Sequence, residues 1–310
     1  MPAFSHTIAE AVPSGGMRLD CYVAELGLLS RSQIKARGLK AAVNGKESKI
    51  SRTVKNGDFL ELAWKEAEPV NLVPENIPLN IMYEDDRAVV INKSQGMVVH
   101  PGAGNRRGTL ANALYFRRLE LKKNSKTESS VAEGLRPGIV HRLDKETSGV
   151  IIAAYDDEAL AFLAEQFKSR TAKKTYIAVV SGIPREKKGR VETFIARDPK
   201  DRKRFTTAAR GKPALTFYSV IKTWQSHSLV MLRPKTGRTH QLRVHMRYLG
   251  HPVVGDSLYG IADPVFPKAS LMLHARSLTL VLPGENEQRI FKAPLPERFR
   301  EMMRIAQLHE

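Results

Sequence analysis

Residues 141–150 read His141-Arg142-Leu143-Asp144-Lys145-Glu146-Thr147-Ser148-Gly149-Val150, and they lead into an apolar run that ends at Ala154. Asp144 lies between two cations, Arg142 and Lys145. Neighbouring cations favour the charged form of a carboxylate, so the pattern predicts that Asp144 acts as a nucleophile or base rather than as a proton donor. The alternative is a surface turn with a local ion pair, which is the usual role of such a charge cluster.

The size and composition of the chain predict a soluble protein of two domains. Its 310 residues exceed the usual size of one domain. A single cysteine, Cys21, rules out an internal disulfide and a cysteine-cluster metal site. No apolar run approaches the roughly 20 residues of a membrane span, and the N-terminus has neither a basic leader nor the apolar stretch of a signal peptide. We therefore expect a cytoplasmic location.

The net charge points to a polyanionic partner. Fifty Lys and Arg against 32 Asp and Glu give +18, and residues 183–250 alone hold 17 Lys and Arg against 4 Asp and Glu. A surface that is only solvated normally mixes the two signs. Nucleic acid is therefore the favoured partner. An anionic membrane is a distant second, because no amphipathic anchor is evident.

Local signals in residues 18–63 predict a small unit of two helices and a hairpin. Apolar residues from Leu19 to Leu26 follow helical spacing, and Gly27 suits the end of that helix. Ser30 and Gln33 form a capping box for a second, basic helix. Asn44-Gly45 is a strong hairpin signal.

This arrangement resembles the S4 RNA-binding domain. Arg31 and Lys35 lie one turn apart on the second helix, and Lys46 follows the hairpin turn, so the resemblance implies that all three contact RNA. The alternative is a small α+β module whose basic face is only solvated. The residues that carry the match are Arg18, Asp20, Ser30, Arg31, Asn44, Gly45, Lys46, Gly57 and Asp58.

The domain organisation follows from composition and from the order of predicted elements. We assign residues 1–64 to the S4-like domain, 65–79 to a proline-containing linker and 80–310 to a second domain. Residues 121–135, rich in Lys and Ser, are predicted to be a disordered loop. Strands recur in the second domain with few helices between them, which favours a mixed, mainly antiparallel sheet and an α+β fold class.

Residues 141–150 resemble the catalytic motif of the RluA-type RNA pseudouridine synthases, and further segments match that family in order. They are Val98–Gly102, the Lys174-x-Tyr176 motif, residues 233–246 and residues 271–275. The resemblance implies that Asp144 is the essential carboxylate. It also implies that Tyr176 stacks on the target uracil and is a candidate to handle a proton. From composition alone, Tyr176 would be a half-buried aromatic side chain of a strand.

Residues 233–246 combine an anion site with a predicted helix. Thr239 can cap a helix whose apolar side packs inward, and a helix N-terminus with flanking cations binds anions. The family resemblance implies that Arg238 pairs with Asp144. Arg243 and Arg247 are either part of an RNA track or a solvated helix face, and the sequence favours neither.

Basic residues near these motifs are the predicted RNA contacts of the second domain. Residues 198–213 form a basic stretch whose default interpretation is a mobile, solvated loop; in this family such a stretch approaches the RNA, where phosphate contacts position the substrate. The predicted contacts are Arg142, Lys174, Arg202, Lys203, Arg204, Lys235 and Arg243.

The resemblance implies the isomerisation of uridine to pseudouridine in structured RNA, with large-subunit ribosomal RNA as the expected substrate and tRNA as an alternative. The reaction needs no cofactor and no metal, and His240 and His245 are spaced so that they face different sides of a helix. A protein kinase is excluded because its glycine-rich loop and Asp-Phe-Gly triplet are missing. A non-catalytic ribosome-assembly factor remains the competing function. A monomer is the default expectation.

Overall fold

The computed structural model describes residues 3–9, 12–29, 33–34, 37–65, 72–102, 104–124 and 138–308. The chain divides into two compact units, Met1–Asn71 and Leu72–Glu310. Within the described segments, no helix is long and apolar enough to cross a membrane.

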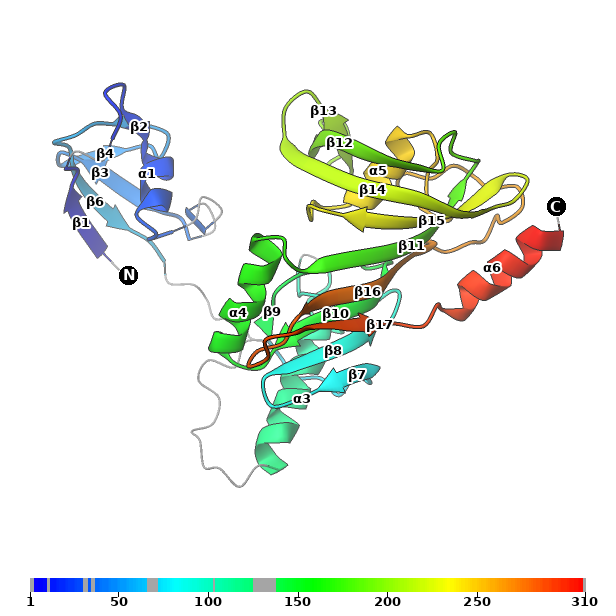
Figure 1. The fold of residues 1–310 in the computed structure, drawn as a ribbon. Coiled ribbons are helices and arrows are strands. Elements are labelled where there is room, and N and C mark those ends of the chain that lie inside the picture. Colours follow the sequence, from blue (N-terminus) through cyan, green and yellow to red (C-terminus); the bar gives the residue numbers. More distant parts are fainter. Residues whose placement is uncertain are drawn as a thin grey trace. The chain divides into compact units, whose positions relative to one another are not determined.

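In the described residues of the first unit, helix α1 packs on a small sheet (Figure 1). The sheet has the strand order β1-β6-β3-β4, and β2 pairs separately with β5. Asn44 and Gly45 join β3 to β4 with positive φ angles of 54° and 73°, which is the twist that a two-residue hairpin requires. The elements are β1 (Ala3–Thr7), β2 (Met17–Arg18), α1 (Leu19–Glu25), β3 (Lys40–Val43), β4 (Lys46–Ser48), β5 (Thr53–Val54) and β6 (Phe59–Ala63).

The first predicted helix and the hairpin are confirmed in this unit. Leu19 and Val23 are fully buried, whereas Leu26 caps the end of α1 and is 36% exposed. Arg31 and Lys35, the two predicted RNA contacts of the second helix, lie outside the described residues. Lys46 is exposed on β4.

The second unit is built on one 11-stranded sheet with the order β13-β12-β14-β15-β11-β16-β10-β8-β7, to which β17 and β9 add at β16 and β10. The pair β10 and β16 is parallel and the other pairs are antiparallel, so the predicted mixed, mainly antiparallel sheet is confirmed. The strands and helices are β7 (Ile81–Glu84), β8 (Ala88–Lys93), α3 (Leu110–Asn124), β9 (Gly138–Ile139), β10 (Ser148–Ala154), α4 (Asp157–Lys168), β11 (Lys173–Ser181), β12 (Lys188–Arg197), β13 (Phe205–Ala208), β14 (Lys212–Thr223), β15 (His227–Pro234), α5 (Gln241–Tyr248), β16 (Leu273–Val281), β17 (Gln288–Lys292) and α6 (Glu297–Leu308).

The parallel contact between β10 and β16 explains the glycine of the opening motif. Gly149 lies opposite Ala275 with a φ of +115°, and a Cβ on Gly149 would come within 2.2 Å of the Ala275 carbonyl oxygen. Only glycine allows the two strands to approach so closely. The loop that carries Asp144 is therefore held directly against the centre of the sheet.

Two predicted boundaries differ in the structure. Residues 72–79, which we had placed in the linker, belong to the second unit: Asn112 Nδ2 donates to the Val73 carbonyl at 2.8 Å, and the Glu75 carboxylate accepts from Gly108 N at 3.1 Å. The predicted loop at 121–135 begins inside α3, which continues to Asn124. Its remaining residues, 125–135, lie outside the described part of the chain.

The helix start near residue 240 also differs from the prediction. The first residue of α5 is Gln241, and His240 occupies the cap position with a left-handed φ of 56°. Thr239 is exposed, and no side chain caps the helix, so the predicted Thr239 cap is wrong. By contrast, Asp156 caps α4 with its side chain, and its carboxylate accepts from Ala159 N at 2.7 Å.

Candidate active site

A pocket of about 560 Å³ in the second unit collects most of the predicted site residues. Its walls come from the 141–147 loop, from β11 and from the segment that joins β15 to α5. Residues that lie far apart in the sequence therefore face one cavity. The predicted residues that line it are Arg142, Asp144, Lys174, Tyr176, Lys235, Arg238 and Arg243.

The loop that carries Asp144 is held from beneath by a buried lysine. Lys93, only 1% exposed, donates from Nζ to the carbonyl oxygens of Ser94 and Met97 at 2.8 Å and of Lys145 at 3.2 Å. The Lys145 carbonyl also accepts from Gly96 N at 2.9 Å. Burial lowers the pKa of Lys93 from 10.5 to about 8. Three backbone carbonyls thus take the place of water around the buried Lys93 ammonium. One of them belongs to Lys145, so this contact fixes the backbone next to Asp144.

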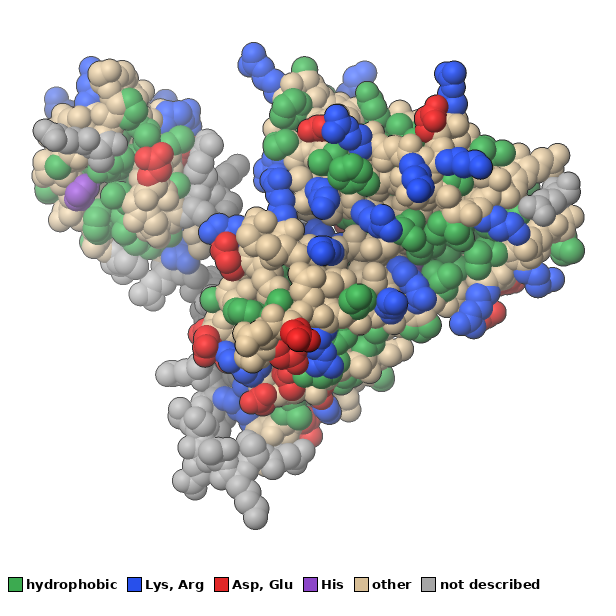
Figure 2. Space-filling view, viewed as in Figure 1, with side chains coloured by type: hydrophobic (Ala, Val, Ile, Leu, Met, Phe, Trp, Pro, Cys, Tyr) green, Lys and Arg blue, Asp and Glu red, His purple; other side chains and the backbone are tan. Residues whose placement is uncertain are grey.

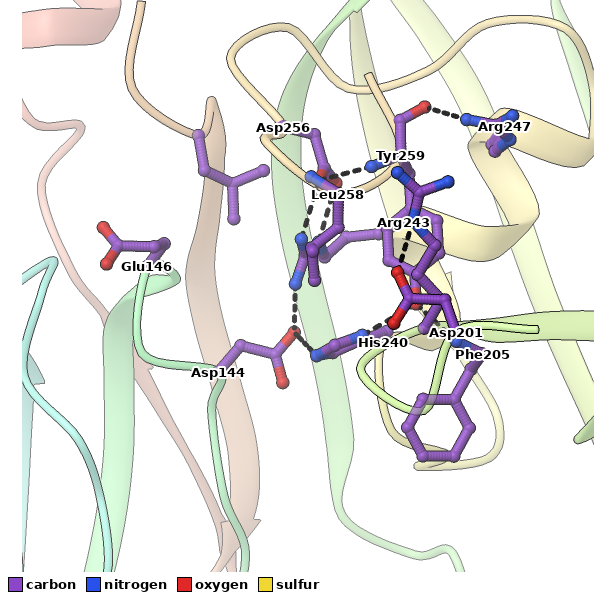
Figure 3. Close-up of polar contacts among 12 residues, drawn as sticks. Asp144, Glu146, Asp201, Phe205, His240, Arg243, Arg247, Asp256, Leu258 and Tyr259 are labelled. Carbon is purple, nitrogen blue, oxygen red and sulfur yellow. Dashed lines mark hydrogen bonds and ion pairs between the residues drawn. The ribbon is translucent and has the colours of Figure 1, made fainter. Parts of the chain in front are cut away.

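Arg243, and not Arg238, pairs with Asp144 (Figure 3). Arg243 Nη1 lies 3.4 Å from Asp144 Oδ2, whereas Arg238 donates from Nε to the Pro213 carbonyl at 2.9 Å. The predicted Arg238–Asp144 pair is therefore wrong. Arg238 lies in the turn before α5, whereas Arg243 lies on the buried side of the helix.

The guanidinium of Arg243 is held by a second carboxylate. Arg243 makes a bidentate pair with Asp256, with both N···O distances at 2.6 Å, and Asp256 Oδ1 also accepts from the backbone of Leu258 and Tyr259. Burial disfavours both charges, but their mutual hydrogen bonds outweigh it, so the pKa of Arg243 is raised and the pKa of Asp256 is lowered. Arg243 is 6% exposed and bound by two acids, so its charge is held within the protein, and its predicted role as an RNA contact stays a prediction.

His240 lies on the other side of Asp144. Its Nε2 is 3.9 Å from Asp144 Oδ2, and its Nδ1 is 2.8 Å from the Tyr259 hydroxyl. That hydroxyl already accepts from Phe205 N at 2.8 Å, so we assign its proton to the bond with His240 Nδ1. Burial lowers the pKa of His240, although Asp144 opposes the shift. A neutral imidazole then directs its Nε2–H toward Asp144.

Tyr176 enters the pocket from β11 at an irregularity of the sheet. The register between β11 and β16 shifts between Thr175 and Tyr176, and a bulge of this kind re-aims a side chain. Burial, and then the nearby Asp144, raise the pKa of the Tyr176 phenol well above its ordinary value. The hydroxyl therefore stays protonated at neutral pH.

Aromatic and basic side chains extend the pocket wall beside Tyr176. His141 stacks on Phe167 with ring centroids 4.4 Å apart, and its Nε2 accepts from Ile152 N at 3.1 Å. Burial, and then the nearby Lys174, lower the pKa of His141 to about 3. Lys174 lies 6.0 Å from the Phe167 ring centroid, and burial lowers its pKa as well. His141 is thus neutral and serves to anchor the loop rather than to carry charge.

A buried polar cluster supports the loop from the C-terminal side. Arg298 on α6 donates from Nη2 to Ser148 Oγ at 2.6 Å, and that hydroxyl lies 2.9 Å from His274 Nδ1. His274 is fully buried, and burial lowers its pKa to about 4. Residues 271–275, one of the segments that match the family, thus place His274 directly behind Ser148, which follows Asp144 in the sequence.

The basic stretch at 198–213, whose default interpretation was a mobile loop, is an ordered turn at 198–204 followed by β13 and the start of β14. Asp198 N donates to the Arg204 carbonyl at 3.1 Å, and Arg204 N donates to the Asp201 carbonyl at 2.9 Å. Phe205, at the base of this turn, makes an edge contact with the His240 ring at 5.6 Å. The structure therefore brings Arg202, Lys203 and Arg204 to the side of the pocket that is formed by His240.

Sequence reasoning missed Asp256, Tyr259, Lys93 and Gln241. Gln241 is buried and ties the turn before α5 to β14, accepting from Thr236 Oγ1 at 2.7 Å and donating to the Leu215 carbonyl at 3.0 Å. One signal was available: the sequence has no acidic residue between Asp201 and Asp256. A lone acid after so basic a stretch is a natural partner for a buried arginine.

Comparisons with known proteins agree with this geometry. The sequence model of the RNA pseudouridylate synthase family matches residues 87–248. The ribosomal large subunit pseudouridine synthase D of Borreliella burgdorferi is 42% identical over 296 residues, covering 93% of this chain and 89% of that protein. The protein of the same name from Xanthomonas campestris pv. campestris is 36% identical and covers 94% of this chain and 89% of its own. The solved structure of human RNA pseudouridylate synthase domain containing 4 superposes with a TM-score of 0.59 at 28% identity, covering 74% of this chain and 93% of that one. With Asp144, Tyr176 and Arg243 gathered in one pocket of the matched domain, the chain belongs to the RluA-type RNA pseudouridine synthases.

Proposed function

We propose that this enzyme isomerises uridines of large-subunit ribosomal RNA, with Asp144 as the catalytic carboxylate. The observation that carries the site assignment is the ion pair between Asp144 Oδ2 and Arg243 Nη1 at the floor of the pocket. The substrate assignment is supported by the names of the relatives from Borreliella burgdorferi and Xanthomonas campestris. Because bacterial ribosomes assemble in the cytoplasm, a ribosomal substrate also supports a cytoplasmic location.

The reaction breaks the bond between ribose C1′ and N1 and rejoins the same uracil through C5. N1 gains a proton and C5 loses one, so the atoms balance without a redox partner, a phosphate donor or a metal. Asp144 acts on the ribose, at C1′ as a nucleophile or at C2′ as a base. Arg243 pairs with the carboxylate and aims it in a site that is partly closed to water.

Tyr176 would hold the detached base while it turns. An aromatic ring stacks on a uracil in any in-plane orientation, so stacking keeps the base in place without opposing its rotation. The target nucleotide must first leave its helix, at a cost of a few kcal/mol. The cations at the pocket mouth, Arg142, Lys174, Lys235 and Arg238, would offset that cost by binding the flanking phosphates.

We further propose that the first unit is an S4-like domain that grips structured RNA, and that the enzyme acts as a monomer. The β3–β4 hairpin and the exposed Lys46 support this assignment. The second unit contributes every residue of the pocket. Removal of residues 1–71 should therefore weaken binding to long structured RNA and leave turnover on a short stem-loop.

Pseudouridine mapping tests the whole proposal. RNA from cells that lack the gene is treated with carbodiimide and read by reverse-transcription stops, and is compared with RNA from cells restored by the wild type or by Asp144→Asn. Sites in large-subunit ribosomal RNA that vanish on deletion and return only with the wild type are expected. If only sites in tRNA are lost, the substrate is tRNA and not ribosomal RNA. If no site is lost, the protein is an RNA-binding assembly factor without this activity.

A further inference from the structure

The sheet of the second unit has an open side, opposite helix α5, that none of the site residues uses. His245 of α5 contacts Thr193 Oγ1 of β12 at 3.1 Å and Thr216 Oγ1 of β14 at 2.9 Å. Because side chains alternate along a strand, the neighbours of these threonines point to the other side. We name that side the outer face; its side chains include Lys188, Arg190, Glu192, Phe194, Phe217, Met231 and Arg233.

A phenylalanine lies between two arginines at the centre of the outer face. Phe217 on β14 is the cross-strand partner of Arg190 on β12 and of Arg233 on β15. All three side chains are exposed, and Phe217 retains 37% of its accessible surface. Phe194, further along β12 on the same face, is 45% exposed. Cross-strand neighbours lie close enough to bind one ligand together.

Glu192 lies on the outer face two residues from Arg190, and among the described residues it forms no ion pair with either arginine of this row. Within the described part of the chain, neither Arg190 nor Arg233 forms an ion pair with Asp or Glu. The three strands β12, β14 and β15 hold six Lys and Arg and one acidic residue, Glu192. Figure 2 shows the side of the second unit on which β14 lies in front, where Lys and Arg side chains alternate with hydrophobic ones and acidic side chains are few.

We propose that the outer face is a second RNA-binding surface, on which unpaired bases stack on Phe217 and Phe194 while Arg190 and Arg233 bind the phosphates between them. An open sheet with exposed aromatics and flanking cations is the arrangement by which single-stranded RNA is bound without sequence preference. The proposal goes beyond the catalytic pocket, because it concerns RNA outside the target nucleotide.

Two other occupants fit the outer face less well. A protein partner would have to bring carboxylates to Arg190 and Arg233, whereas RNA carries a phosphate at every nucleotide. A second copy of this chain, placed face to face, would oppose the same cations to each other in a chain of net charge +18. RNA offers bases that stack on the phenylalanine rings and phosphates that pair with the arginines.

Binding of labelled oligoadenylate to the full-length enzyme tests the surface directly. Phe217→Ala should weaken binding about 5- to 150-fold, the loss expected for one base–aromatic stack, whereas Phe217→Trp should retain it. The pair Arg190→Gln and Arg233→Gln should reduce the slope of log affinity against log salt by about 1.4, since each single-strand phosphate contact contributes about 0.7. A matched control is Ile290→Ala with Lys292→Gln, which removes an exposed apolar side chain and a cation from β17.

Pseudouridine formation on a short stem-loop should be unchanged in all these variants, so that the test does not depend on the catalytic proposal. Wild-type oligoadenylate affinity in Phe217→Ala, or an equal loss in the β17 control, would overturn the proposal. So would a photo-crosslinking amino acid at position 217 that captures only protein, or only a second copy of the chain, in the presence of RNA.

Discussion

Asp144 and Arg243 are 99 residues apart in the chain, and their side chains meet at 3.4 Å across the pocket. The same guanidinium holds Asp256 at 2.6 Å through two parallel bonds. Asp256 therefore anchors the arginine, and the third nitrogen of the arginine is left to serve Asp144. Because Asp256 binds two nitrogens of the guanidinium, the nitrogen that faces Asp144 is oriented before any RNA binds. The first three predictions below depend on this arrangement.

Asp144→Asn should abolish pseudouridine formation, with a fall of at least about 10³-fold, and leave folding and RNA affinity nearly unchanged. The amide keeps the shape of the carboxylate but is neither a nucleophile nor a base at neutral pH. The measurement is single-turnover conversion of a stem-loop, together with its affinity. Glu146→Gln removes a nearby acid that lies outside the pocket lining and should retain activity. Comparable losses in both variants would point to net charge rather than to a catalytic role.

Arg243→Gln should destabilise the protein by about 3–5 kcal/mol, because it leaves the buried Asp256 without its cation. Arg238→Gln should change the free energy of unfolding by less than about 1 kcal/mol, because that side chain bonds a single backbone carbonyl. Urea denaturation of the two variants compares them directly.

The double variant Arg243→Met with Asp256→Asn separates stability from catalysis at this pair. It should recover much of the lost stability, because no uncompensated buried charge remains, but none of the activity. Recovery of turnover in the double variant would show that Arg243 serves the fold alone.

His240 and Tyr259 should act as one unit in kinetics. His240→Gln and Tyr259→Phe both break the 2.8 Å bond that orients the imidazole toward Asp144. Each should lower kcat by roughly 10- to 100-fold with little change in KM, and the double variant should be no worse than the worse single one. Additive losses in the double-mutant cycle would contradict the shared role.

Much of the fold was readable in the sequence because its signals are local. The helical spacing of Leu19 to Val23 and the Asn44-Gly45 turn are each set by residues within one turn of each other, and both are confirmed. Resemblance to a family then indicated which of these elements surround Asp144.

The arginine partner of Asp144 was mispredicted because it depends on which side of α5 faces the pocket. Arg238 precedes the helix, whereas Arg243 lies on its buried side. That side is set by tertiary packing, which the local sequence does not show. Asp256 and Tyr259 were missed because they act from a loop whose approach is set by tertiary contacts alone.

The free energy of unfolding of the second unit should decrease as the pH falls, because the buried His274 becomes protonated. The pKa of this buried imidazole is lowered to about 4, because burial and then Arg298 disfavour its charged form. The neutral form is favoured in the folded state, so its contribution is full above pH 6.5 and is lost as pH falls from 6.5 through 4. The pKa difference corresponds to roughly 3 kcal/mol.

Urea denaturation between pH 7 and pH 4 measures this contribution. The free energy of unfolding of the wild type should drop more steeply than that of His274→Gln over this range, because glutamine does not titrate. Parallel curves for the two proteins would rule out His274 as the source of the acid sensitivity.

Tyr176→Phe separates the ring of Tyr176 from its hydroxyl. Phenylalanine keeps the surface that holds the base, so RNA affinity should match the wild type, whereas Tyr176→Leu should lose the stack and about 1–3 kcal/mol of binding to the flipped nucleotide.

Burial raises the pKa of the Tyr176 phenol, so its ionisation cannot drive turnover near neutrality. The pH–rate profile of any residual activity in Tyr176→Phe should therefore keep the shape of the wild-type profile between pH 6 and 9. A rate that climbs with pH in the wild type and is flat in Tyr176→Phe would instead identify a phenolate base, and would mean that substrate binding reverses the effect of burial on this tyrosine.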